Sequence, residues 1–189
     1  MECQETGGSC CYLIDGKDRI VHVSDTWLEF ARENEAAESC HPDKILNQSL
    51  WDFIDGIETR HLYEIVLEKI RRTRRSVRLP FRCDAPDKRR YLELRITAAQ
   101  NDTIEFSSTV LREEARDTVE LLKADIPRSE EFLKICSMCK KVEVTKNFWL
   151  DVEAAIAALR LFENSKLPKI SHGLCRECFR FGLAEIERL

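Results

Sequence analysis

The sequence contains little glycine or proline and no long apolar run, and these absences exclude several classes of protein. Its 189 residues include only 6 Gly and 5 Pro, which excludes collagen-like and low-complexity chains. No apolar segment approaches the roughly 18 residues that a membrane-spanning helix needs. Residues 1–10 lack the basic and apolar regions of a secretion signal. Because 43% of the residues are hydrophobic and 34% are charged, we expect a globular, cytoplasmic protein with no membrane partner.

The length fits one domain and a small additional module, and it is too short for a multi-domain enzyme. The sequence contains no nucleophile elbow, phosphate loop, zinc-protease or kinase motif, so we predict no catalytic residues. The net charge is −4, yet residues 60–95 carry 12 Lys or Arg against 5 Asp or Glu, a local +7 that leaves −11 for the remainder. The middle of the chain is therefore basic and its ends are acidic.

The first part of the chain alternates between strand and helix patterns. Two β-branched runs flank an Asp-Gly-Lys-Asp turn within residues 12–23, which indicates a β-hairpin. Trp27, Phe30 and Ala31 then repeat at helical spacing. A 3.6-residue period across residues 59–72 predicts a longer helix. The order is thus two strands followed by helices.

Beyond residue 75 the apolar side chains recur at every second position, which is typical of half-buried strands. The pattern covers residues 77–82, 91–96 and 103–111, so three further strands are expected. Residues 112–128 are highly charged and carry a proline near their end, which predicts a helical or irregular connector. We place a domain boundary near residue 130.

This order of elements over residues 8–112 resembles a PAS domain. The similarity rests on segment 12–16, the helix containing Trp27, the helix around His61 and the closing strands. It implies an α+β fold with a five-stranded antiparallel sheet, whose concave face is covered by helices and either binds a small ligand or is filled with side chains. Because PAS domains sense, dimerise and relay without catalysis, the resemblance also implies a homodimer with a ligand or protein partner.

Four of the nine cysteines form two C-x-x-C pairs, Cys136 with Cys139 and Cys175 with Cys178. In a reducing cell, such pairs indicate metal binding rather than disulfides. Two thiolates from a knuckle and two from the start of a helix satisfy the four tetrahedral positions of Zn²⁺. We predict a structural zinc site of treble-clef type, since four filled positions leave none open for catalysis. A redox dithiol or an iron site is the alternative.

The tail, residues 131–189, resembles a cysteine module found at the ends of some bacterial PAS and response-regulator proteins. That module often has proline at the position of Arg176, a departure that leaves the cysteines intact. Because so short a segment has little core, metal–ligand bonds must supply much of its folding free energy. Between the cysteine pairs we expect a helix that packs on the terminal helix, with an apolar face formed by Val152, Ile156, Leu159 and Phe162.

Two histidines are candidate ligands. His61 lies in the helix from which haem-containing PAS domains present an axial histidine, so it is a candidate haem ligand, although a histidine beside Arg60 at a helix start is more often exposed. His172 precedes the second cysteine pair and can either contact the metal or occupy the turn beside it.

The sequence leaves three functions open. The first is a non-enzymatic sensor or adaptor, in which residues 8–112 respond to a ligand or partner, residues 113–130 connect and residues 131–189 present an interaction surface. The second is a nucleic-acid-binding regulator that uses the zinc module and the basic stretch, with Arg71 and Arg74 on phosphates. The pI of 5.7 argues against this second function, because a nucleic-acid-binding domain is expected to be basic. The third is a haem-based gas or redox sensor that uses His61.

Overall fold

A computed structural model describes residues 9–33, 38, 40–163 and 165–189, and residue 8 of the predicted first domain lies outside this part. The front of the chain forms a five-stranded antiparallel sheet in the order β2-β1-β5-β4-β3. Its strands are β1 (Cys10–Ile14), β2 (Ile20–Val23), β3 (Val77–Arg82), β4 (Lys88–Ala98) and β5 (Ile104–Ala115). The predicted hairpin and the three later strands are confirmed, as is the α+β fold class.

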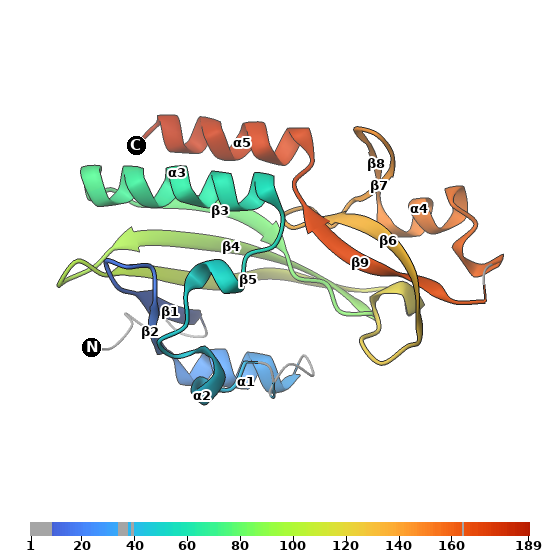
Figure 1. The fold of residues 1–189 in the computed structure, drawn as a ribbon, viewed down its shortest axis with the longest axis horizontal. Helices are drawn as coiled ribbons and strands as arrows, with labels where there is room; N and C mark the ends of the chain where they lie inside the picture. Colours follow the sequence, from blue (N-terminus) through green and yellow to red (C-terminus); the bar gives the residue numbers. More distant parts are fainter. Residues whose placement is uncertain (1–8, 34–37, 39, 164) are drawn as a thin grey trace.

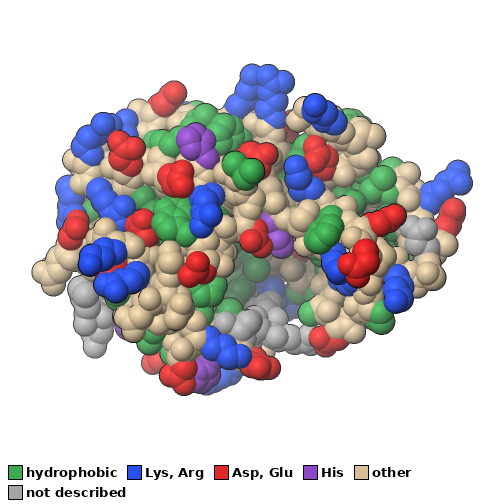
Figure 2. Space-filling view, in the orientation of Figure 1, with side chains coloured by type: hydrophobic (Ala, Val, Ile, Leu, Met, Phe, Trp, Pro, Cys, Tyr) green, Lys and Arg blue, Asp and Glu red, His purple; other side chains and the backbone are tan. Residues whose placement is uncertain are grey.

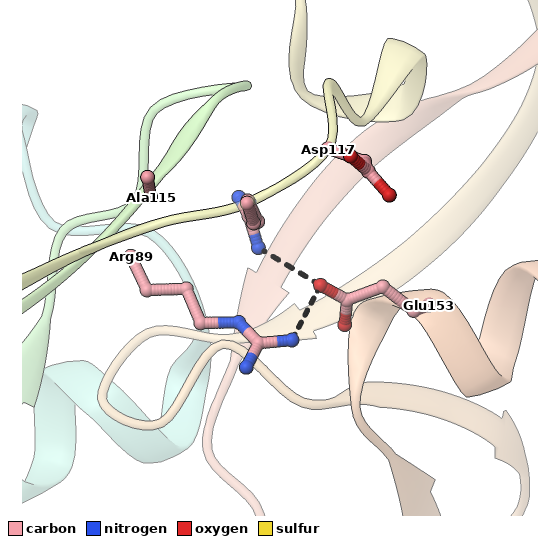
Figure 3. A pocket seen from close by; sticks show the side chains of 5 residues that line it. Arg89, Ala115, Asp117 and Glu153 are labelled. Atoms are coloured by element: carbon pink, nitrogen blue, oxygen red, sulfur yellow. Dashed lines mark hydrogen bonds and ion pairs between the residues drawn. The ribbon is translucent and has the colours of Figure 1, made fainter.

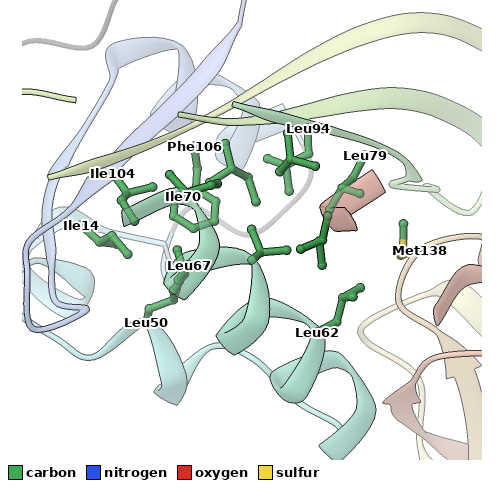
Figure 4. Close-up of a cluster of buried hydrophobic side chains, with 14 of the residues drawn as sticks. Ile14, Leu50, Leu62, Leu67, Ile70, Leu79, Leu94, Ile104, Phe106 and Met138 are labelled. Carbon is green, nitrogen blue, oxygen red and sulfur yellow. The ribbon is translucent and has the colours of Figure 1, made fainter. Parts of the chain in front are cut away.

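Helices accompany this sheet: α1 (Asp25–Glu33), α2 (Pro42–Ile45), a 3₁₀ turn η1 (Leu50–Asp52) and α3 (Ile57–Thr73). The predicted long helix is α3, and it lies along the sheet (Figure 1). Figure 4 shows its side chains Leu62, Leu67 and Ile70 pointing toward residues of the sheet such as Leu94 and Phe106. The apolar residues at helical spacing on α3 thus meet the alternating residues of the strands.

The back of the chain forms a second, mixed sheet in the order β8-β7-β6-β9. The pairs β6–β7 and β7–β8 are antiparallel, whereas β9 runs parallel to β6. The elements are η2 (Glu120–Leu122), β6 (Arg128–Cys136), β7 (Val142–Thr145), β8 (Phe148–Leu150), α4 (Val152–Ala158), η3 (Leu161–Glu163), β9 (Leu167–Gly173) and α5 (Arg176–Glu187). No helix among the described residues combines the length and the apolar character that crossing a membrane requires.

The two larger apolar cores among the described residues follow the two sheets, but their residues do not separate at the domain boundary that the sequence predicts. We call the larger one the first core: it fills the space between α3 and the five-stranded sheet, and it also includes tail residues Cys136, Met138, Leu174, Cys175 and Ile186. The second core lies in the mixed sheet and joins Ile135 and Val142 to residues of α4. The tail therefore contributes to both cores.

The prediction that the helix after Trp149 packs on the terminal helix is wrong. Val152 and Ile156 of α4 are buried in the second core, and Phe162 is 62% exposed. The terminal helix α5 instead lies beside α3, at the upper side of the first sheet in Figure 1. The physical reason is the parallel strand β9, which leads the chain from the mixed sheet back to the first sheet before α5 begins.

The segment predicted as a helical or irregular connector begins as strand, because β5 continues to Ala115 beside Lys88 of β4. A 3₁₀ turn, η2, then leads to β6 at Arg128. The boundaries proposed for the three regions stay predictions.

Candidate metal centre

The first cysteine pair lies in a tight turn at the end of β6. Cys136 is the last residue of that strand, and its amide donates a hydrogen bond to the Lys141 carbonyl at 2.8 Å. The Lys140 amide donates back to the Cys136 carbonyl at 3.0 Å. Lys140 has φ of 60°, a left-handed conformation that closes such a turn. The knuckle expected from the C-x-x-C spacing is therefore present.

The second pair lies at the start of α5, where Cys175 is the N-cap residue. Strand pairing brings it to the knuckle, because Cys136 of β6 is in register with Gly173 of β9. The Ser137 amide also donates to the Gly173 carbonyl at 2.7 Å. Two residues beyond Gly173, the chain presents Cys175, so the parallel register itself makes the two cysteine pairs converge.

The four sulfur atoms form a compact group. The Sγ atoms of Cys136, Cys139, Cys175 and Cys178 all lie within 4.8 Å of one another. Cys139 Sγ and Cys175 Sγ are 3.8 Å apart. Zn–S bonds of about 2.3 Å in a regular tetrahedron place sulfur atoms about 3.8 Å apart, so the spacing fits a tetrahedral thiolate site. His172 is exposed and is not part of the group.

The electrostatics of the four thiols also fit a bound cation. Hydrogen bonds from the thiols of Cys139 and Cys178 lower the pKa of Cys136 well below its ordinary range, and backbone amides add to this effect. Hydrogen bonding to Cys136 raises the pKa of Cys139 to about 12, and the pKa of Cys178 is raised further by both neighbours. The Cys136 thiolate thus suppresses ionisation of Cys139 and Cys178. Four thiolates can coexist here only around a metal cation, and soft sulfur donors suit zinc or iron.

Direct contacts fix the knuckle to the first sheet. The Arg82 amide at the end of β3 donates to the Met138 carbonyl at 2.7 Å, and Arg82 Nη1 donates to the Cys139 carbonyl at 3.2 Å. Gly56, with φ of +86°, begins α3 so close to β9 that a Cβ there would lie 2.7 Å from the His172 carbonyl oxygen. The four-cysteine cluster therefore lies at the junction of the two sheets.

An ionic cluster that the sequence analysis did not identify lies at the same junction. Asp84, whose side chain is 2% exposed, accepts hydrogen bonds from Arg82 and from Arg116 at 3.2 Å. Glu153 of α4 accepts from Arg89 at 2.6 Å and from Arg116 at 3.4 Å. Figure 3 shows Arg89 and Glu153 pointing toward each other. Arg116, in the predicted connector, thereby joins the first sheet to the mixed sheet.

The interior of the first domain contains a stack of aromatic rings. Tyr12 and Tyr63 lie on Phe106 with centroid distances of 4.6 and 6.3 Å, and the Trp27 ring meets Tyr12 edge-on at 5.4 Å. Burial raises the pKa of Tyr63 to about 12 and that of Tyr12 well above its ordinary value. The Trp27 Nε1 donor is buried and has no hydrogen-bond partner among the described residues.

Figure 2 shows a hollow near the middle of one face, with hydrophobic side chains inside it.

His61, the candidate haem ligand, has a 60% exposed side chain on α3. Its Nδ1 lies 3.8 Å from a Glu64 carboxylate oxygen, and its ring centroid is 6.3 Å from that of Phe179. The histidine thus lies between α3 and α5, outside the buried aromatic stack. Haem ligation stays a prediction that this geometry does not favour.

Much of the basic stretch is paired with carboxylates. Arg71 contacts Asp18, and Arg78 lies 3.6 Å from Glu93. Lys88 and Arg90 both contact Glu113, at 3.4 and 2.9 Å. These pairs neutralise part of the positive charge that the sequence concentrates in the middle of the chain.

No protein-family model and no curated protein matches this chain. A similar solved structure is the PAS domain of the Cronobacter turicensis RpfR quorum-sensing receptor in complex with C12:0. The likeness covers 58% of this chain and 100% of that one, at 10% sequence identity and a TM-score of 0.43.

Proposed function

We propose that this protein is a non-enzymatic sensor or adaptor. In this proposal residues 8–112 bind a small molecule in the aromatic interior, and residues 131–189 are folded around a structural Zn²⁺ and pass on the response. The dimerisation and cytoplasmic location expected from the sequence belong to the same proposal.

The observation that carries the proposal is the buried indole N–H of Trp27, which has no hydrogen-bond partner among the described residues. A buried donor without an acceptor costs about 1–3 kcal/mol, so a ligand that supplies an acceptor recovers this energy. The neighbouring rings of Tyr12, Tyr63 and Phe106 provide apolar contact area. These features favour an apolar ligand that carries one hydrogen-bond acceptor, such as a carbonyl group.

A matched pair of probes tests this preference. We expect an aromatic ketone to bind roughly tenfold more tightly than the hydrocarbon of the same shape, because only the ketone accepts from Trp27 Nε1. In Trp27→Phe the two probes should bind equally, as measured by isothermal titration calorimetry. A wild-type protein that binds neither probe, and that carries no small molecule in native mass spectrometry, would contradict ligand sensing.

Zinc is the metal proposed for the site because four thiolates in tetrahedral spacing suit Zn²⁺, an ion that undergoes no redox reaction. The second C-x-x-C pair at a helix start and the first in a knuckle agree with the proposed treble clef. Elemental analysis of protein purified without added metal should give one zinc per chain. Iron in its place would contradict a purely structural role.

Sequence-independent nucleic-acid binding is the less favoured function. It requires a continuous row of unpaired basic side chains. Arg71, which the sequence predicts as a phosphate contact, forms an ion pair with Asp18. Filter binding with single- and double-stranded DNA at low salt tests this function directly.

A further inference from the structure

A basic cavity of about 670 Å³ lies where the ends of α3 and α5 meet the edge of the first sheet. We call it the arginine cleft. Its charged lining residues are Arg74, Arg75, Arg78, Arg95, Arg188 and Glu185. Five arginines against one glutamate give these side chains a net charge of +4. Only three of the arginines lie in one short segment of sequence, and the fold brings Arg95 and Arg188 to them.

Part of this positive charge is neutralised by carboxylates, and part of it is not. Glu185 is paired with Arg188. Arg74 donates to the uncharged carbonyl oxygen of Ala99 at 2.5 Å, and Arg75 donates to a backbone oxygen of Leu189 at 2.9 Å. These hydrogen bonds hold the guanidinium groups in place and leave their other N–H groups available.

Two arginines on adjacent strands complete the cleft. Arg78 of β3 is in register with Arg95 of β4 and has only a 3.6 Å contact with Glu93, at 63% exposure. Arg95 is exposed, and no hydrogen bond or ion pair within the described residues engages it. Like charges on adjacent strands destabilise a sheet, and a bound anion would relieve this repulsion.

The shape and lining of the cleft limit what it can bind. A concave surface of one charge focuses the electrostatic potential, and the planar guanidinium fork matches the oxygens of phosphate. No aromatic side chain lines the cavity, so it offers no platform for stacking a nucleic-acid base. We propose that the arginine cleft is a binding site for a small phosphate-bearing anion.

This site is distinct from the aromatic interior proposed to bind an apolar ligand. It is formed jointly by the end of α3 and the end of α5, the helix that starts at the second cysteine pair. The anion should therefore bind more tightly when α5 is docked, which links the two events thermodynamically. The inference does not depend on the proposed sensor function.

The test is isothermal titration calorimetry of the full chain with pyrophosphate at low salt. We expect binding that Arg95→Gln weakens about tenfold, the loss typical of one charge-assisted contact. Arg188→Gln should weaken it as well. The matched control is Arg180→Gln, which removes the same charge from an exposed position on α5 outside the cleft and should leave the affinity within about twofold.

Three outcomes would overturn the proposal. The first is no pyrophosphate binding by the wild-type protein. The second is an equal loss of affinity in Arg95→Gln and Arg180→Gln, because general surface charge would then explain the binding. The third is a single-stranded oligonucleotide that binds more tightly than pyrophosphate and depends on the same arginines, which would replace the small anion by nucleic acid.

Discussion

The two cores of this protein differ in how they use the tail. The second core is built within the mixed sheet, from Ile135, Val142 and the residues of α4. The first core begins with the hairpin and α3, but it also buries Cys136, Cys175 and Ile186. The cysteine-containing tail is thus more than an independent module, because residues of its terminal helix are part of the first core.

A metal bound by the four cysteines would have a specific structural task. The four thiols lie between the sheets, and α5 begins at the second cysteine pair, with Cys175 as its N-cap, and packs beside α3. A metal bound there would stabilise the docking of α5 on the first core. The second core contains none of the four cysteines, so it should depend less on the metal.

The largest effect is expected from removing a metal ligand. Cys136→Ser takes one thiolate from the group, and we expect loss of the metal and a decrease of about 4 kcal/mol or more in the free energy of unfolding. Urea denaturation with metal analysis measures both. The control is Cys83→Ser, which changes a half-buried thiol outside the group and should cost about 1 kcal/mol or less. Equal losses in the two variants would contradict a metal-dependent fold.

The next largest effect concerns the ionic cluster that joins the two regions. Arg116→Met leaves the buried Asp84 carboxylate with Arg82 as its remaining partner. Since breaking a buried ion pair costs about 3–5 kcal/mol, we expect about 3 kcal/mol in urea denaturation. Arg112→Met removes an arginine that is 60% exposed and should cost about 0.5 kcal/mol or less. A small effect of Arg116→Met would show that the cluster does not join the regions.

A smaller effect is expected where α5 meets α3. A Cβ at Gly182 would lie 2.7 Å from Leu62 Cδ2, so Gly182→Ala requires the buried Leu62 side chain to shift and should cost about 1–2 kcal/mol. Combined with Leu62→Ala, which removes the opposing methyl groups, the glycine substitution should cost about 1 kcal/mol less than it does alone. Strict additivity in a double-mutant cycle would mean that the two residues do not touch.

The smallest effect is a dependence on pH. Burial opposes ionisation of Glu153, but the hydrogen bond from Arg89 and the charges of Arg89 and Arg116 prevail and lower its pKa. A carboxyl group with a lowered folded pKa stabilises the protein above its unfolded pKa of about 4.3 and loses this contribution as the pH falls through the folded value. Wild type should therefore be more stable than Glu153→Gln at pH 7, and the difference should shrink below about pH 4. A constant difference would contradict the assignment.

Local patterns predicted the main elements of the first sheet and the four cysteines that the fold brings together. The Asp-Gly-Lys-Asp turn, the 3.6-residue period of α3 and the alternation in β3 to β5 each reflect interactions between neighbours in the sequence. The two C-x-x-C pairs identified four residues whose sulfur atoms the fold brings within 4.8 Å. These patterns are recognisable in the sequence because turns, helices, strands and C-x-x-C pairs each require particular residues at a fixed, short spacing.

Long-range packing could not be predicted in the same way. The apolar stripe of α4 shows that the helix buries one face, but not that its partner is the mixed sheet rather than α5. Arg116 and Asp84 are 32 residues apart, and nothing in their local sequence marks them as a buried pair. The arginine cleft likewise depends on Arg95 and Arg188, which are brought together only by the docking of α5 on the first sheet.

Hydrogen–deuterium exchange with and without a zinc chelator tests the central claim most directly. On removal of the metal, we predict faster exchange in α5 and in the facing part of α3 around Leu62, while β7 and α4 in the second core keep their protection. Unchanged protection of α5, or loss confined to the second core, would contradict the claim that the metal holds the terminal helix on the first domain.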